Sequence, residues 1–390
     1  MRLIFIAIML WVITGSSSVS ADQGRPGATG PHKDFKQADW ECETESKPRE
    51  IRDYLAYAEV QANADDPLPR DEAQYQDGVK QDTPRSLPPG ALGPARTVPS
   101  TAEKPEIIST LNVPYGQSPG VGANLLSLDI YAPQGAKGLP VMVYVHGGFW
   151  MLGDKTHTAH MPAFFCGHGF VFVSVNYRLS PAVKHPVHIE DVARAVAWVH
   201  DHIAQHGGDP AQILLMGHSA GGHLVALLGT DARRLGECGK PLSILRGVIL
   251  LDPAPLDIRD AVANERRTDR SFRAVFGEEP AAWADASPIV HAARAKDLPP
   301  FQIVIASGPA LAKKKSRMEV FAAVVREAGS RAEIVDASAV RNHRSLRTEF
   351  GAADDPVCKS VLEFIESVRC GKADPGLDAE PTLQRESRHG

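Results

Sequence analysis

The sequence lacks an excess of positive charge. Its 390 residues include 42 lysines and arginines against 47 aspartates and glutamates, which gives a formal net charge of −5. Nucleic acids and anionic membrane surfaces attract proteins through clustered basic side chains. We therefore expect no nucleic-acid partner and no strong electrostatic attraction to a membrane.

Cysteine is also scarce, and the spacings that bind zinc are missing. The odd number of five cysteines leaves at least one thiol outside any intramolecular disulfide. The sequence contains neither Cys-x-x-Cys nor His-Glu-x-x-His, which are the common metal-ligand patterns. We therefore expect no metal and no other cofactor. The cysteines are Cys42, Cys166, Cys238, Cys358 and Cys370.

The sequence also lacks an apolar run long enough to cross a membrane. Residues 3–14 form an apolar run of about 12 residues, whereas a spanning helix needs about 20. Arg2 precedes this run, and Val19-Ser20-Ala21 follows it as a small-residue cleavage pattern. These features predict a signal peptide over residues 1–21 and a secreted or periplasmic protein, with an uncleaved N-terminal anchor as the alternative.

Residues 213–222 contain the first motif with a chemical interpretation. An apolar Ile-Leu-Leu-Met run leads into Gly-His-Ser-Ala-Gly, with Ser219 at the centre. In a nucleophile elbow a strand turns sharply into a helix, and flanking glycines leave the space that a Cβ atom would fill. The pattern predicts Ser219 as a nucleophile at a strand tip, between Gly217 and Gly221.

A second motif lies about 70 residues upstream, where the apolar residues 140–145 run into His146, Gly147 and Gly148. Glycine lets the backbone approach a developing oxyanion closely, so that amide N–H groups point at it. The residue after the nucleophile, Ala220, supplies a further N–H. We expect Gly147, Gly148 and Ala220 to form an oxyanion hole; the alternative is an ordinary strand-to-loop turn.

A histidine follows the last predicted strand. Residues 331–335 favour a strand, and residues 341–346 follow as a loop that contains His343. The order serine, acid, histidine along the chain is that of the α/β-hydrolases. We expect His343 to be the general base, although a surface histidine in a basic loop is the simpler alternative.

Together these motifs resemble the hormone-sensitive-lipase-like carboxylesterases, near the group that contains kynurenine formamidase and bacterial feruloyl-esterase-like proteins. The resemblance covers roughly residues 105–370. It implies that Ser219 attacks an ester or amide carbonyl, that His343 carries the proton, and that Gly147 and Gly148 bind the oxyanion. The motifs that carry it are His146 to Trp150, Asp154-Lys155, Val175 to Pro181, Gly208-Asp209-Pro210, Gly217 to Gly222 and His343.

The sequence departs from this family at two places. Phe149 stands where the family often has a third glycine, so its side chain is expected to narrow the acyl pocket. The family's catalytic carboxylate follows a strand that corresponds here to residues 301–306, yet residues 307–315 contain no acid.

A substitute acid is needed because a carboxylate fixes the histidine tautomer and stabilises the imidazolium. Asp252, at the end of a predicted strand over residues 247–251, preserves the chain order. Asp257 and Asp336 are further candidates. If none of them reaches His343, we expect a slow enzyme.

The chain organisation predicts the α/β-hydrolase fold: a mostly parallel eight-stranded sheet flanked by helices, with cap insertions. We divide the chain into the signal peptide, an N-terminal extension over residues 22–105 that is partly disordered or lid-forming, a hydrolase domain over residues 106–372, and a flexible tail over residues 373–390. The predicted strands are residues 107–113, 126–131, 141–145, 170–175, 213–216, 248–251, 301–306 and 332–335.

These features predict a serine hydrolase of the carboxylesterase type that cleaves a small or aryl ester through an acyl-enzyme. A formamidase or amidase of the same fold is one alternative. A catalytically weakened hydrolase-fold protein used for binding is another, suggested by the missing acid. The expected partner is a small-molecule ester or amide, and the oligomeric state is left open.

Overall fold

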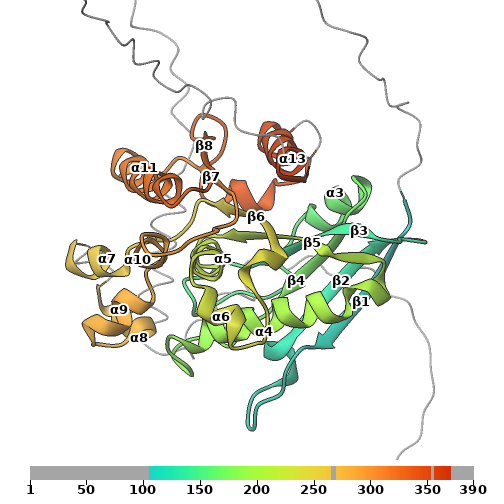
Figure 1. Ribbon diagram of the computed structural model, residues 1–390, viewed down its shortest axis with the longest axis horizontal. Coiled ribbons are helices and arrows are strands. Elements are labelled where there is room, and N and C mark those ends of the chain that lie inside the picture. The colour runs from blue at the N-terminus through green and yellow to red at the C-terminus, as the bar shows by residue number, and fades with distance from the viewer. Residues whose placement is uncertain (1–104, 265–268, 353–354, 370–390) are drawn as a thin grey trace, which may run out of the picture. The chain divides into compact units, whose positions relative to one another are not determined.

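The computed structural model describes residues 105–264, 269–352 and 355–369 (Figure 1). The predicted signal peptide, nearly all of the N-terminal extension and the C-terminal tail lie outside these residues. No described helix is long and apolar enough to cross a membrane.

Eight strands form one sheet in the order β1-β2-β4-β3-β5-β6-β7-β8. β1 pairs antiparallel with β2 and β2 antiparallel with β4, while the other neighbours are parallel. The predicted α/β-hydrolase fold is thereby confirmed. The strands are β1 (Ile107–Pro114), β2 (Ser127–Pro133), β3 (Leu139–Val145), β4 (Val171–Val175), β5 (Gly208–His218), β6 (Leu245–Leu251), β7 (Phe301–Ile305) and β8 (Ala332–Asp336).

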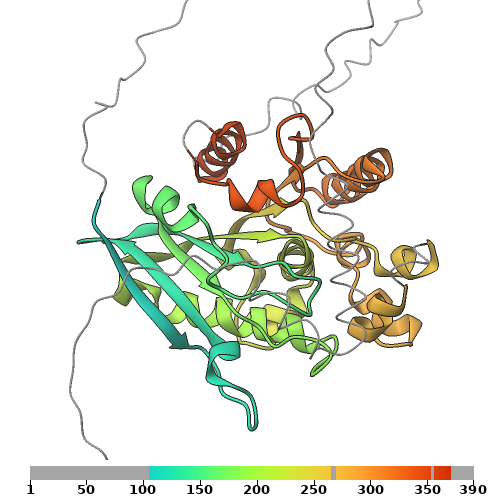
Figure 2. The ribbon, with the colours of Figure 1, turned by 180° about the vertical axis from the view of Figure 1, so that it is seen from behind.

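Helices connect the parallel strands and cover both faces of the sheet (Figures 1 and 2). The α-helices are α3 (Met161–Gly167), α4 (Val187–His202), α5 (Ala220–Thr230), α6 (Ala232–Gly236), α7 (Ile258–Asn264), α8 (Asp269–Phe276), α9 (Pro280–Asp285), α10 (Pro288–Ala292), α11 (Leu311–Glu327), α12 (Ser345–Thr348) and α13 (Pro356–Arg369). Short 3-10 turns are η1 (Ala123–Leu126), η2 (Ile203–His206) and η3 (Leu242–Ile244).

The alternation of side chains along β3 separates the two hydrophobic cores. Val141, Val143 and Val145 point into a core shared with α4, α5 and α11. Met142 and Tyr144 point to the opposite face, where α3 and α13 pack. Because both faces are covered, β3 consists of a continuous apolar run, as a buried parallel strand requires.

Two local differences from the sequence prediction have simple causes. β5 extends back to Gly208, because Leu139 of β3 pairs with that glycine before the apolar run begins. The expected loop over residues 341–346 is wrong at its end, because α12 begins at Ser345. There the Asn342 side chain accepts a hydrogen bond from the Ser345 amide at 2.7 Å, and side chains of this kind favour helix starts.

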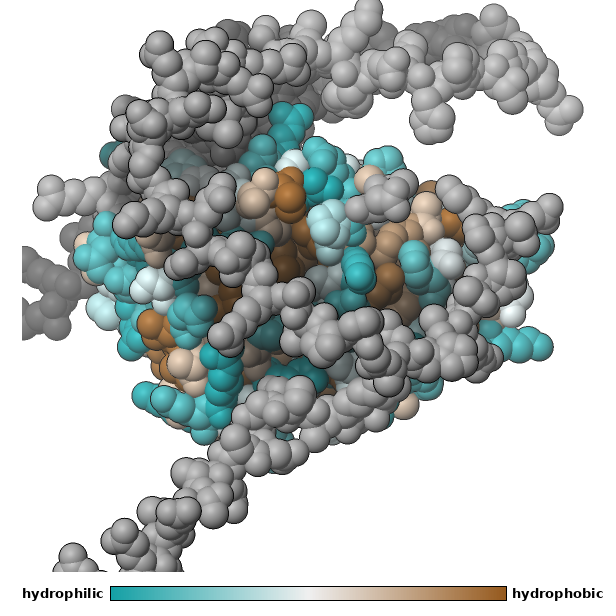
Figure 3. All heavy atoms as spheres, turned by 90° about the horizontal axis from the view of Figure 1, so that it is seen from above, coloured by the Kyte–Doolittle hydropathy of each residue, from teal (hydrophilic) through white to brown (hydrophobic). Residues whose placement is uncertain are grey.

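The excursion between β6 and β7 carries the four short helices α7 to α10 (Figure 2). It packs through buried apolar residues such as Phe272 and Phe276. On the face seen in Figure 3, the visible described residues are a mixture of hydrophilic and hydrophobic side chains. Large apolar side chains that are exposed include Ile108 and Leu111, both on β1.

Candidate active site

Ser219 lies in the sharp turn between β5 and α5. Its backbone has φ 54° and ψ −119°, a conformation that costs energy for a residue with a side chain and often marks a functional site. A Cβ at Gly217 would lie 2.3 Å from the Gly221 carbonyl oxygen, and one at Gly221 would lie 2.0 Å from that of Val145. Only glycine therefore fits at positions 217 and 221, two residues before and two residues after Ser219, as in a nucleophile elbow.

The loop after β3 approaches this turn closely. A Cβ at Gly147 would lie 2.8 Å from the His218 carbonyl oxygen and 3.0 Å from Ser219 Cβ. Gly148 has φ 124°, and a Cβ there would lie 2.2 Å from the Leu152 carbonyl oxygen. Ala220 is the first residue of α5, where the amide N–H has no partner within the helix. The structure thus brings the Gly147 backbone and the Ala220 amide to Ser219.

A buried polar network holds this loop in place. The Asn176 side chain donates to Asp154 Oδ2 at 2.9 Å and accepts from the Lys155 amide at 2.6 Å. The Tyr177 hydroxyl donates to the His146 carbonyl oxygen at 3.2 Å. These side chains tie the end of β4 to the segment after the glycines, so the loop position does not depend on the glycines alone.

His343 and Asp252 are in direct contact. His343 Nδ1 lies 2.5 Å from Asp252 Oδ2, and the Asp252 side chain is 1% exposed. Asp252 follows β6 with φ 43°, and its Oδ1 accepts the Ala306 amide at 3.0 Å. Of the three candidate acids, Asp252 is the one that contacts His343, whereas Asp257 and Asp336 pair with other side chains, those of Arg259 and Lys315.

His343 also contacts the residue that precedes the serine. The His218 and His343 rings lie 4.6 Å apart between centroids, and His218 Nε2 lies 2.8 Å from the His343 carbonyl oxygen. A carbonyl only accepts, so His218 Nε2 carries a proton. Within the described residues the His343 side chain is hydrogen-bonded to Asp252 alone, so the expected bond with Ser219 Oγ is not formed in this state. Catalytic hydrogen bonds often tighten only when substrate binds.

The protonation of this cluster follows from burial and charge. Burial raises the pKa of the Asp252 carboxyl, but the hydrogen bond and charge of His343 and the charge of Lys314 outweigh it, and the net pKa lies below its usual range. Burial, with the nearby His343, lowers the pKa of His218 to about 3. Asp252 is therefore a carboxylate and His218 is neutral at pH 7.

Lys314 joins the cluster from α11 and was not anticipated from the sequence. Its Nζ lies 2.9 Å from both carboxylate oxygens of Asp252 and 3.3 Å from the Ala306 carbonyl oxygen. The signal available in the sequence was the run of three lysines, residues 313–315, in the segment where the family has its acid. The segment that carries the acid in the family therefore contributes a lysine here, and that lysine pairs with Asp252.

Aromatic side chains lie between the oxyanion loop and the excursion. The Phe149 ring is partly buried and lies 5.3 Å from the Phe272 ring of α8. Trp150 is fully buried and packs edge-on against Phe276 at 4.9 Å, and Met151 is also buried. Of these three loop residues, Phe149 remains the candidate for narrowing an acyl pocket.

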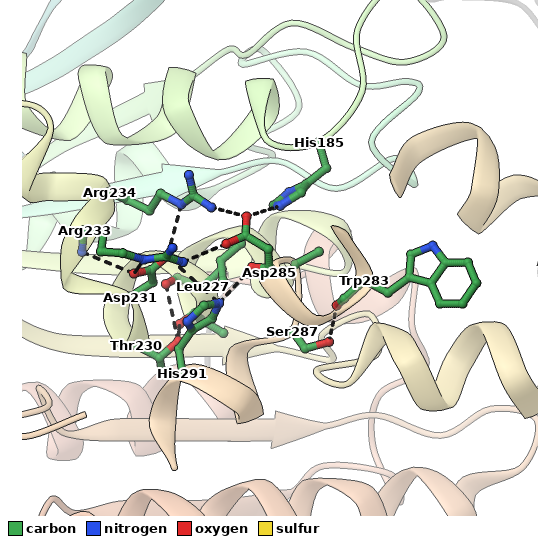
Figure 4. A network of polar contacts seen from close by, with 12 residues as sticks. His185, Leu227, Thr230, Asp231, Arg233, Arg234, Trp283, Asp285, Ser287 and His291 are labelled. Atoms are coloured by element: carbon green, nitrogen blue, oxygen red, sulfur yellow. Dashed lines mark hydrogen bonds and ion pairs between the residues drawn. The ribbon is translucent and has the colours of Figure 1, made fainter. Parts of the chain in front are cut away.

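One group of described residues has metal-ligand chemistry, namely Asp231, Asp285 and His291, whose ligand atoms lie within 4.8 Å of one another. Two arginines already neutralise these carboxylates (Figure 4). Arg233 bonds both aspartates at 2.7 Å, and Arg234 contacts both as well. We interpret the group as an ion-pair network that joins α6 to the excursion.

The fold and this site together define the class: a protein with the α/β-hydrolase fold, a serine at the nucleophile elbow and a histidine–carboxylate pair beside it. Residues 128–309 match the BD-FAE family. Among curated relatives from Mycobacterium tuberculosis, Esterase LipQ is 43% identical over 127 residues, which are 32% of this chain and 29% of LipQ. Esterase LipC is 31% identical over 201 residues, 49% of this chain and 48% of LipC. The resemblance to the hormone-sensitive-lipase-like carboxylesterases is confirmed.

The chain spans less than half the length of these curated relatives. Solved structures extend the likeness at the level of the fold. A truncated carbohydrate esterase from gut microbiota has a TM-score of 0.55 at 22% identity, over 69% of this chain and 99% of that chain. Esterase Est2 from Thermogutta terrifontis has a TM-score of 0.51 at 25% identity, over 71% and 95%.

Proposed function

We propose that this protein is a serine carboxylesterase that cleaves a small or aryl ester through an acyl-enzyme. The single observation that carries the proposal is the contact between His343 Nδ1 and Asp252 Oδ2 at 2.5 Å, beside the elbow that holds Ser219. Asp252 thus supplies a carboxylate that orients the base, although the sequence has no acid at the position where the family usually carries it.

In this mechanism Ser219 Oγ attacks the ester carbonyl carbon while its proton passes to His343 Nε2. The amide N–H groups of Gly147, Gly148 and Ala220 stabilise the oxyanion that forms. The C–O bond to the alcohol then breaks, and His343 returns the proton to the leaving oxygen. Water attacks the acyl-enzyme by the same route and releases the acid, while Asp252 stabilises the imidazolium at each step.

The relatives support ester chemistry, since LipQ and LipC are named esterases. The alternative of a weakened binding protein rested on a missing acid, and Asp252 removes that support. A formamidase or amidase would use the same side chains, so amide substrates belong in the assay beside the esters.

The test compares the wild-type protein with Ser219→Ala on a panel of short p-nitrophenyl esters and matched anilides. We expect ester hydrolysis that falls by at least about 10⁴-fold in the variant, because the nucleophile is lost. A fluorophosphonate probe should add its mass to the wild-type protein and leave the variant unmodified. A wild-type protein that neither hydrolyses any ester nor reacts with the probe would refute the proposal.

We also propose that the protein is exported. The proposal rests on the apolar residues 3–14 and on the cleavage pattern Val19-Ser20-Ala21. The mature chain is expected to begin at Asp22. N-terminal sequencing of protein from the extracellular or periplasmic fraction checks this, and an intact Met1 confined to the cytosol would contradict it.

A further inference from the structure

We propose that Lys314 is a positioning residue that sets the pH at which the Ser219–His343 pair becomes active, by sharing the carboxylate of Asp252 with His343. The inference rests on the proposed esterase function. A carboxylate with a histidine as its single charged partner directs its full charge at the imidazole. Here an ammonium group competes for the same oxygen.

The geometry of the shared carboxylate carries the argument. Asp252 Oδ2 lies 2.5 Å from His343 Nδ1 and 2.9 Å from Lys314 Nζ, while Oδ1 accepts bonds from both Lys314 and the Ala306 amide. The two links through Oδ2 place the ammonium within about 5.4 Å of the imidazole, their summed length. The carboxyl group thus has a partner on each side and a fixed orientation.

Burial makes this interaction strong. The Asp252 side chain is 1% exposed and that of Lys314 is 23% exposed, so solvent screens the pair far less than it screens a surface ion pair. A cation at this distance disfavours a second positive charge on the imidazole. Lys314 therefore offsets part of the attraction that the Asp252 carboxylate exerts on a protonated imidazole, and so opposes protonation of the base that must accept the serine proton.

The other charged groups near His343 stay the same when the wild-type protein is compared with the Lys314 variants. His218, at the end of β5, lies against His343 with its ring tilted and has its pKa lowered to about 3 by burial, so it stays neutral in an assay. Arg347 of α12 exerts its charge on His218 and keeps that charge at all relevant pH values. Of the groups that bond Asp252 directly, Lys314 carries the positive charge.

The experiment measures kcat/KM against pH for p-nitrophenyl acetate with two neutral variants. Lys314→Met keeps the side-chain length, and Lys314→Gln also keeps a hydrogen-bond donor for the buried carboxylate. In both we expect the midpoint of the acidic limb to move up by about one pH unit. Lys314→Arg preserves the charge and should keep the wild-type midpoint even if its turnover falls.

The matched control is Lys315→Met. Lys315 is the next residue of the same helix, but it pairs with the exposed Asp336. Its profile should superimpose on that of the wild type. Profiles of Lys314→Gln and Lys314→Met that also superimpose on the wild type, or that move to lower pH, would overturn the inference.

A second readout does not depend on turnover. The proton between His343 Nδ1 and Asp252 should give a far-downfield NMR signal whose chemical shift changes as Nε2 takes up a proton, and the midpoint of that change should move to higher pH in Lys314→Gln, in parallel with the kinetic limb. An unshifted titration contradicts the role of Lys314. Failure of the proposed function is distinct from this result, because in that case the wild-type protein itself lacks hydrolysis and probe labelling.

Discussion

At the scale of single residues, the site has glycine positions that leave no room for a Cβ atom. Its carboxylate, Asp252, follows β6 and not the strand that carries the acid in the related family. The sequence predicts Ser219 and the glycines from short contiguous motifs and His343 from its place after the last strand. Their contacts are long-range, as between Gly221 and Val145 or between His343 and Asp252, and their catalytic roles stay predictions. Asp252 was one of three candidates, since contiguity says nothing about which strand end faces the histidine. Lys314 was missed because its contact joins α11 to the end of β6, and no local pattern records that distance.

The role of Asp252 is testable by Asp252→Asn. The amide keeps the shape of the side chain but presents no negative charge to the imidazolium, so turnover should fall by about 10³- to 10⁴-fold with the fold intact. Steady-state kinetics and circular dichroism measure the two effects. Asp336→Asn, at an exposed acid that pairs with Lys315, is the control and should retain wild-type turnover. Equal activity in Asp252→Asn would leave a serine–histidine dyad.

Elements were predicted more completely than contacts. All eight strands appear in order. The parallel strands are apolar runs between helical patterns, which define buried parallel strands, whereas β1 and β2 pair antiparallel. The observed strand ends differ from the predicted ones by a few residues where pairing with a neighbouring strand sets the end, as at Gly208 of β5. The ion-pair network on α6 and α9 had no sequence signal, because its members come from segments about 50 residues apart.

That network should fix the excursion to the rest of the fold. The Asp285 carboxylate lies 2.9 Å from His185 Nε2 and accepts a hydrogen bond from Arg233 at 2.7 Å. It also pairs with Arg234. We expect Asp285→Asn to lower the free energy of unfolding by about 2 kcal/mol, because the buried Arg234 loses a charged partner. Urea denaturation measures this. Asp201→Asn removes an exposed pair with Lys240 and should cost less than about 1 kcal/mol.

The same network predicts a pH dependence. Hydrogen bonds from His185 and Arg233 outweigh burial and hold the pKa of Asp285 below its usual range. A depressed folded-state pKa stabilises the fold above the unfolded value, near pH 4, and that contribution is lost as the pH falls further. The difference in stability between the wild-type and Asp285→Asn proteins should therefore begin to shrink near pH 4 and narrow further as the pH falls, as acid titration of both proteins would show. A difference that persists unchanged at lower pH would contradict this account.

At the scale of the whole molecule, four of the described histidines are buried, some at the site and some elsewhere in the interior. Burial lowers the pKa of His146 to about 4 and the pKa values of His188, His218 and His223 to about 3. Each is neutral in the folded protein at pH 6, whereas an unfolded chain protonates histidine near pH 6.5. The unfolded state thus binds more protons below that pH, and the fold loses stability as pH falls.

The expected size of this loss is large. Each such histidine contributes about 1.4 kcal/mol per pH unit once the pH is well below about 6, so four together approach about 5.5 kcal/mol per unit. Urea unfolding at pH 7.5, 6 and 5 should show a steep decline in the free energy of unfolding. His223→Gln, which keeps a donor for the Ala286 carbonyl oxygen that His223 Nε2 bonds at 2.7 Å, should reduce the slope by about one proton. His160→Gln, at an exposed histidine, should leave it unchanged, and a flat profile between pH 7.5 and 5 would contradict the burial of neutral histidines.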